Sequence, residues 1–353
     1  MSAILLIIIL AILVLSHEFG HFIFAKLFGM KVEEFGIGLP PRITGFKRGE
    51  TLYSVNWIPF GGFVRILGED STNEKAQSDG AFSTKSRKAQ AIVVVAGILF
   101  NIIFAFLLMW FGFFAIGLPV STADYSSYGS SLTDRHTVIT YVKPGSAGEK
   151  AGITGGSTID EIGAGTLTIV TPSPDDVSRL VREYAGTPIS LHFSEGEEIL
   201  VVPDPLIGIE MDEVGTLTLG PIDSLVVGTK ATFYLTYRTA VGIALFLKDT
   251  FTGNGSLSAV VGPVGIASLV GEASKQGFAS LLLLTVILSI TLAVVNCIPF
   301  PALDGGRLLF IIIETIKGRP IKEKIVGVTN AVGFALLLLL MVVVTIHDVS
   351  KFF

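Results

Sequence analysis

The stretch Met1–Phe28, MSAILLIIILAILVLSHEFGHFIFAKLF, decides the fold class of this chain. Its residues 1–16 carry no charged side chain. A helix needs roughly 20 apolar residues to cross a hydrocarbon core of ~30 Å, and this stretch reaches that length only by continuing through the polar side chains of His17, Glu18 and His21. Polar side chains at that depth are costly and are usually functional. The sequence therefore predicts a membrane helix that carries a functional site.

The composition of the whole chain also favours a membrane protein. Of its 353 residues, 50% are hydrophobic and 16% are charged, whereas an average soluble domain carries roughly 25% charged residues. The net charge of -5 offers no basic surface for nucleic acid, and the single cysteine, Cys297, excludes a disulfide framework within the chain. Three further runs without charge complete the prediction of a polytopic α-helical membrane protein with four transmembrane helices, at residues 1–28, 89–118, 276–303 and 325–347.

The distribution of Lys and Arg predicts the orientation of these helices. Nine of them lie in residues 29–88 and five in residues 299–324, whereas the 162 residues 118–279 hold only nine. Because short loops rich in Lys and Arg stay in the cytoplasm, we expect residues 29–88 and 304–324 on the cytoplasmic side of the membrane and both termini on the opposite side. No basic residue precedes Lys26 and no small-residue cleavage site is present, so we expect the first helix to be retained rather than removed as a signal peptide.

Two segments outside the helices have patterns typical of β-structure. Residues 29–88 are predicted to form a membrane-associated β-loop and a polar connector, because alternating apolar residues are combined with turn residues such as Gly61 and Gly62. Residues 119–222 are predicted to form an inserted α+β domain outside the membrane. Here the sequence PGSAGEKAGITGGSTIDEI (Pro144–Ile162) resembles a bacterial PDZ domain, which implies peptide binding at a sheet edge. An inert spacer domain is the alternative.

The sequence HEFGH at residues 17–21 carries the predicted chemistry. A spacing of four places both imidazoles on one helical face, where they can bind one Zn²⁺ while Glu18 acts on water as a general base. A catalytic zinc needs a third protein ligand and an open position. We expect Asp304 to be that ligand, because it ends the sequence NCIPFPALD (Asn296–Asp304) on the same side of the membrane. The remaining histidines, His136, His192 and His347, are expected on the other side and are not candidates.

Residues 223–275 are apolar but are interrupted by charged side chains at Lys230, Arg238, Lys248 and Asp249. This pattern is more typical of an amphipathic helix at the membrane interface than of a spanning helix. A fifth span here would also place HEFGH and Asp304 on opposite sides of the membrane. We therefore predict an interfacial segment.

Together these motifs resemble the site-2 protease family and, more narrowly, the bacterial intramembrane zinc metalloproteases of the RseP type with a single PDZ domain. The resemblance covers nearly the whole chain. It rests on HEFGH in the first helix, on N-x-x-P-x-P-x-L-D-G-G after the third helix, and on the loop sequences FGIG and PFGGFV. Membership of this family implies zinc as the cofactor and membrane lipid as the surroundings of the site.

The resemblance also implies roles for individual residues. The implied zinc ligands are His17, His21 and Asp304, the implied base is Glu18, and the implied substrate-binding residues are Asn296, Gly61, Gly62 and Phe63. Residues 97–101 of the second helix are similar to a further family segment. Ile98 stands where that segment usually has proline, so the role of Asn101 stays open between helix packing and function.

The implied reaction is hydrolysis of peptide bonds within the transmembrane segments of single-pass membrane proteins, such as anti-sigma factors or remnant signal peptides. Two alternatives use the same residues differently. A membrane scaffold would hold partners through the PDZ-like domain, but it gives no reason to keep both histidines together with Glu18 and Asp304. A divalent-metal transporter would use the histidines and the aspartate, but it does not require Glu18.

Overall fold

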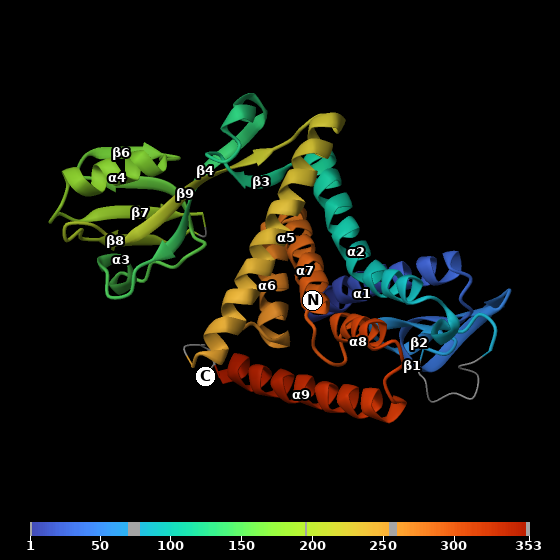
Figure 1. Ribbon diagram of the computed structural model, residues 1–353. Coiled ribbons are helices and arrows are strands. Elements are labelled where there is room, and N and C mark those ends of the chain that lie inside the picture. The colour runs from blue at the N-terminus through green and yellow to red at the C-terminus, as the bar shows by residue number, and fades with distance from the viewer. Residues whose placement is uncertain (1, 70–77, 195, 254–259, 351–353) are drawn as a thin grey trace. The chain divides into compact units, whose positions relative to one another are not determined.

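The computed structural model describes residues 2–69, 78–194, 196–253 and 260–350. The chain forms two compact units, of which the first comprises Met1–Phe111 and Leu225–Phe353 and the second comprises Gly112–Ser224 (Figure 1). Four parts of the predicted segments lie outside the described residues: residue 1 in the first predicted helix, 70–77 in the predicted connector, 195 in the predicted inserted domain, and 254–259 in the predicted interfacial segment.

Within the described residues, four helices are long and apolar enough to cross a membrane. They are α1 (Ser2–Leu27), α2 (Arg87–Phe111), α7 (Phe278–Cys297) and α9 (Glu323–Ser350). A π-helical turn, Gly112–Ile116, extends α2. Among the described residues, the 31-residue helix α5 (Pro221–Phe251) does not join this group, in agreement with its interrupting charges. The prediction of a polytopic protein with four membrane helices is confirmed.

Helices α1 and α2 approach closely because a glycine stands at their contact. A Cβ atom at Gly20 would lie 3.0 Å from Phe100 Cβ and would press on the carbonyl group of Ala96. On another side of α1, apolar side chains pack against Val270 of α6 (Pro263–Gln276). Helix α1, which carries the HEFGH sequence, is therefore packed on both α2 and α6.

The segment after α1 folds into two antiparallel strands, β1 (Val32–Arg48) and β2 (Thr51–Ile66). The sheet curls on itself, because residues 34–37 pair with residues 62–65 on one edge and with residues 52–55 on the other. Strand β2 also packs on α1. The predicted β-loop is thus a curled hairpin that lies beside α1 (Figure 1). Two glycines of β2, Gly61 and Gly62, are close to side chains of α1.

The third membrane helix is shorter than the segment 276–303 predicted for it. Helix α7 ends at Cys297, Ile298 is already extended, and a new helix, α8 (Asp304–Lys317), occupies much of the segment predicted as a loop. Two prolines in this turn prevent the helix from continuing. The first turn of α8 packs so tightly against the segment that connects it to α7 that a Cβ atom at Gly306 would lie 3.0 Å from Pro301 N.

The second unit is a seven-stranded sheet with short helices. Its elements are β3 (Leu118–Ser121), β4 (Leu132–Val142), α3 (Ala147–Lys150), β5 (Thr158–Ala164), β6 (Leu167–Val170), α4 (Pro174–Glu183), β7 (Ile189–Phe193), β8 (Glu198–Val201) and β9 (Ile209–Leu217). The strand order is β3-β9-β4-β5-β7-β8, with β6 paired to β5. Helix α4 buries Val177 and Leu180 in the apolar core of this sheet. An inserted, sheet-rich domain is therefore present, as predicted.

Candidate metal centre

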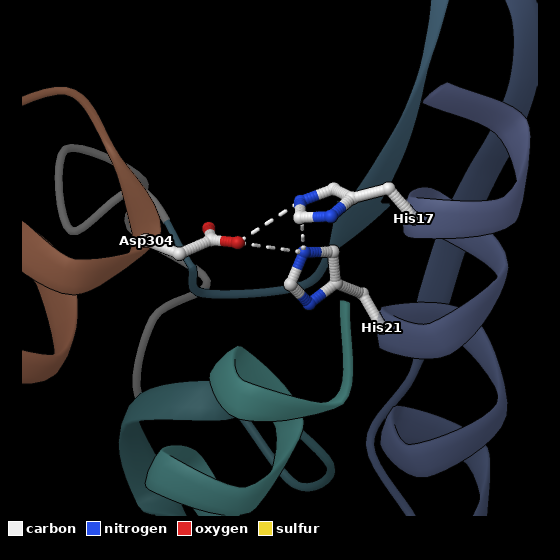
Figure 2. A group of neighbouring side chains, drawn as sticks. All are labelled: His17, His21 and Asp304. Atoms are coloured by element: carbon white, nitrogen blue, oxygen red, sulfur yellow. Dashed lines mark hydrogen bonds and ion pairs between the residues drawn. The ribbon is translucent and has the colours of Figure 1, made fainter. Parts of the chain in front are cut away.

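Two histidines of α1 and one aspartate of α8 converge in the first unit (Figure 2). His17 and His21 are about one helical turn apart, so both rings leave the same face of α1, and Asp304 is the first residue of α8. Asp304 Oδ2 lies 2.9 Å from His17 Nε2 and 3.4 Å from His21 Nε2, and the two Nε2 atoms are 3.2 Å apart. Across the described ranges, no other cluster of three or more metal-binding side chains occurs.

The donor atoms fit a zinc ion. Two imidazole nitrogens and a carboxylate oxygen suit zinc, and three protein donors leave a fourth tetrahedral position open. His17 is 7% exposed and His21 is 9% exposed, while Asp304 Oδ2 is buried without a well-oriented hydrogen bond from any described residue. A cation among the three donors would satisfy that oxygen, whose burial is otherwise costly.

The charge of Asp304 suits the same role. Burial of its carboxyl group would raise the pKa, but the imidazoles of His17 and His21 beside it lower the pKa below the ordinary value. The carboxylate is therefore the ionised form at neutral pH, which is the form that binds a metal.

Both imidazole rings pack against helix α2. His21 Nδ1 lies 2.8 Å from the carbonyl oxygen of Val93, and His17 Nδ1 lies 3.3 Å from Asn101 Nδ2. Between them, a Cβ atom at Gly97 would lie 2.5 Å from His21 Cε1 and 2.9 Å from His17 Cε1. Residue 97 must therefore lack a side chain for both rings to lie against α2. The contact to Val93 uses a backbone carbonyl, so no residue type in the sequence could have revealed it.

Glu18 lies between α1 and the β-hairpin. Its Oε2 accepts a hydrogen bond of 2.9 Å from the backbone N–H of Val64 in β2. A Cβ atom at Gly62 would lie 3.8 Å from Glu18 Cγ, and one at Gly61 would lie 3.6 Å from Val14 Cγ1. The structure thus brings the predicted substrate-binding residue Gly62 to Glu18, and it brings Gly61 to Val14, about one turn earlier on α1. The hydrogen bond from Val64, again a backbone contact, has no sequence signature.

The other two predicted substrate-binding residues have no direct link to the three ligands. Phe63 pairs with Gly36 in the curled sheet, and the guanidinium carbon of Arg65 lies 5.6 Å from the centre of its ring. Asn296 is partly buried in the last turn of α7, and within the described part of the chain no hydrogen bond joins it to the histidines or to Asp304.

An ion pair that the sequence did not predict ties α8 to the segment after β2. Arg307, three residues after Asp304, pairs with the carboxylate of Glu69 and donates a hydrogen bond of 3.1 Å to the backbone oxygen of the same residue. Its guanidinium carbon lies 4.4 Å from the centre of the Phe82 ring, which is a cation–π contact. The helix that carries the third ligand is therefore connected to the β-hairpin.

Comparison with known proteins agrees with this geometry. The model of peptidase family M50 matches residues 5–340. A relative from Clostridium perfringens is 34% identical, over 96% of this chain and 95% of the relative. Two proteins named zinc metalloprotease RasP, from Oceanobacillus iheyensis and Geobacillus kaustophilus, are each 29% identical, over 98% and 100% of this chain respectively and over 98% of their own length.

The family match spans nearly the whole chain, including both the HEFGH helix and α8. Together with the four membrane helices, it supports a multi-pass bacterial membrane protein that depends on zinc. The chain therefore belongs to peptidase family M50, and it is a zinc metalloprotease.

Proposed function

We propose that this protease cleaves the transmembrane segments of single-pass membrane proteins, such as anti-sigma factors or remnant signal peptides, and that it does so within the bilayer. One observation carries the proposal: His17, His21 and Asp304 meet next to Glu18, on a helix that is long and apolar enough to cross a membrane. A protease that acted on soluble substrates would gain nothing from placing these polar groups inside a membrane helix, where they are costly.

In this proposal, His17, His21 and Asp304 hold the zinc. When bound, zinc supplies the Lewis acidity that activates a water molecule and polarises the scissile carbonyl group. The Glu18 carboxylate takes the proton from the attacking water and passes it to the leaving amine. The N–H of Val64, which is 2.9 Å from Glu18 Oε2, orients the carboxylate for both transfers.

The β-hairpin is proposed to hold the substrate. A transmembrane helix hides its carbonyl groups in internal hydrogen bonds, so it must unwind before one of them can be attacked. An extended strand can then be held by backbone hydrogen bonds, as in peptide recognition at sheet edges. Gly61, Gly62 and Phe63 lie in the part of β2 that adjoins Glu18 and are proposed to line the substrate path, with Asn296 as a side-chain donor to the substrate.

We propose that both termini and the sheet-rich unit are extracytoplasmic and that the active site faces the cytoplasmic side of the inner membrane. The support is the count of Lys and Arg, nine in residues 29–88 and five in residues 299–324. Reporter fusions to the two termini and to a loop of the second unit test this orientation. Reporter activity on the cytoplasmic side at any of the three positions would contradict it.

A second proposed activity is peptide binding by the PDZ-like unit. Strand β9 pairs with β4 along its length, but β3 and the residue after it, Thr122, cover only residues 213–217 on its other edge. That edge faces a groove beside α4, which is lined by Val177, Val181, Arg182, Ile207, Ile209 and Met211. An extended peptide can add to the free part of β9, with apolar side chains in the groove and a carboxylate near Arg182.

Binding of a labelled peptide with an apolar C-terminal residue tests the groove. We expect the substitution Arg182→Glu in the full-length protein to abolish binding, because it places a negative charge at an exposed groove position beside the proposed peptide carboxylate. Unchanged binding would show that the groove does not hold the peptide.

The cleavage proposal is tested with the wild-type protein and with two matched variants in detergent, using single-pass model substrates. Glu18→Gln removes the base, and Glu272→Gln makes the same chemical change at an exposed residue of α6. We expect one zinc per chain in all three proteins and cleavage in the wild type and Glu272→Gln alone. Cleavage by Glu18→Gln would exclude the proposed base. A protein without zinc would exclude the metal centre, and a zinc-loaded wild type that cleaves no membrane segment would exclude the substrate class.

A further inference from the structure

Asn101 is the residue whose role the sequence left open, and the structure places it in contact with a proposed zinc ligand. Its side-chain Nδ2 lies 3.3 Å from Nδ1 of His17. Asn101 is 0% exposed, and its Oδ1 has no hydrogen-bond partner among the described residues. Packing of small residues between α1 and α2 is already explained by Gly20 and Gly97, and it gives no reason for a buried amide. An amide buried at this cost requires a further explanation.

The two histidines have different partners on α2. The ring of His21 meets a carbonyl oxygen, 2.8 Å away on Val93, and a carbonyl can only accept. The proton of neutral His21 is therefore on Nδ1, and the lone pair of its Nε2 is free for a metal. The ring of His17 meets an amide instead, which offers one donor group and one acceptor group.

This amide can form a hydrogen bond with either neutral tautomer of His17. With Nδ2 toward the ring, Asn101 donates to Nδ1, and the proton of neutral His17 is on Nε2, which is 2.9 Å from Asp304 Oδ2. Rotation of the amide by half a turn brings Oδ1 to the ring. Oδ1 then accepts a hydrogen bond from Nδ1–H, and Nε2 presents its lone pair to the metal. A fixed carbonyl, such as that of Val93, matches only the second form.

We propose that Asn101 is a positioning residue of the zinc site. Its side-chain oxygen accepts a hydrogen bond from Nδ1–H of His17, which holds the ring in the orientation and in the neutral tautomer that leave the Nε2 lone pair free for the metal. The inference rests on the proposed role of His17 as a zinc ligand. Groups that accept a hydrogen bond from a ligating histidine typically contribute 10–100-fold to metal affinity.

The backbone of Asn101 is itself anchored. The hydroxyl of Ser289 in α7 donates a hydrogen bond of 2.8 Å to the carbonyl oxygen of Asn101, and both residues are fully buried. Helix α7 therefore holds the turn of α2 from which the amide reaches His17. The rotation that the proposal requires is confined to the side-chain amide and needs no movement of the helices.

Three variants of the full-length protein in detergent test the proposal. Asn101→Leu has a similar volume but no polar group, whereas Asn101→Asp keeps an acceptor. Gln90→Leu is the matched control, because it also replaces a buried amide of α2 with leucine, but Gln90 bonds to the backbone oxygens of Phe82 and Lys85. The measurements are the zinc dissociation constant, by competition with a chelating dye, and the visible absorption spectrum of the Co²⁺-substituted protein.

We expect Asn101→Leu to weaken zinc binding by about 10–100-fold and to alter the Co²⁺ spectrum. The zinc dissociation constants of Asn101→Asp and Gln90→Leu should stay within a few-fold of the wild-type value, and their Co²⁺ spectra should match the wild-type spectrum. Equal losses in Asn101→Leu and Gln90→Leu, or a tenfold loss in folded Asn101→Asp, would overturn the proposal. If Asn101→Leu does not fold, Asn101→Asp decides by the same criterion. A wild type that binds no zinc would refute the metal site itself, whereas zinc binding that Asn101→Leu leaves unchanged would refute only the role of Asn101.

Discussion

Replacement of Gly97 by alanine should remove zinc from a protein that remains folded. The added Cβ atom would overlap with Nε2 of His21 and would lie 2.5 Å from its Cε1 and 2.9 Å from His17 Cε1, whereas ordinary contact begins at 3.4 Å, so the ring of His21 must retreat by about 1 Å. Zinc sites tolerate deviations of about 0.2 Å in ligand distance. A displacement of about 1 Å at a reacting centre typically costs about 100-fold in rate. We therefore expect at least a 100-fold loss of cleavage and a clear loss of zinc affinity.

The helix itself should tolerate the change, because alanine in a helix interior is more stable than glycine by roughly 0.5–1 kcal/mol. Gly242→Ala in α5 is the matched control, since nothing lies within 4 Å of its added Cβ atom. The assays are zinc content after dialysis, cleavage of a model substrate and thermal unfolding by circular dichroism. Wild-type zinc content and cleavage in Gly97→Ala would refute the argument that the imidazoles require a residue without a side chain at position 97 of α2. An unfolded Gly97→Ala would show that residue 97 serves the fold instead.

Three further predictions concern the stability of the fold. Asp348→Ala should destabilise the protein by about 1–3 kcal/mol, because the buried carboxylate accepts a hydrogen bond of 2.8 Å from Gly265 N–H at the start of α6. The control Asp249→Ala, at an exposed residue, should change the free energy of unfolding little. Ser173→Ala should cost about 1 kcal/mol at neutral pH, because it removes the N-terminal cap of α4. The hydroxyl and the backbone N–H of Ser173 lower the pKa of Asp176, so the part of the stabilisation that depends on ionised Asp176 is present above the unfolded-state pKa and is lost as the pH falls through the folded-state pKa. The difference in unfolding free energy between the wild type and Ser173→Ala should therefore be smaller at acid pH than at neutral pH, and an equal difference at both would contradict this account. A chelator should lower the melting temperature, since a ligand such as zinc at 100 times its Kd stabilises the folded protein by about 2.7 kcal/mol. The melting temperature of the Glu18→Gln variant should fall by the same amount, because this substitution leaves the zinc ligands in place.

Much of the site could be predicted because the metal-binding pattern depends on residue types and on their spacing along the chain. The interval between His17 and His21 follows from the helical repeat, and their position within an apolar run marks them as functional. Asp304 could be paired with them only through the orientation of the helices and the family resemblance. In the structure the three side chains lie close together. It also shows that Asp304 begins a separate helix, because the chain leaves α7 at Cys297 and turns before α8.

Other features had no local signature. Strand β9 lies between β3 and β4, which precede it by more than 65 residues along the chain. Such pairings depend on chain segments far apart in the sequence. The hydrogen bonds from Val64 N–H to Glu18 and from His21 to the Val93 carbonyl involve backbone groups that every residue type carries.

The sequence by itself determined that this protein spans a membrane and carries a metal-binding pattern inside its first helix. Hydrophobic length, charge distribution and helical spacing are properties of residues close together along the chain, so they need no tertiary information. Only the tertiary structure decided what surrounds the pattern. The bare face of α2 at Gly97, the amide of Asn101 beside His17 and the β2 backbone beside Glu18 exist because distant segments pack together, and packing distances of a few ångströms are set by the fold as a whole.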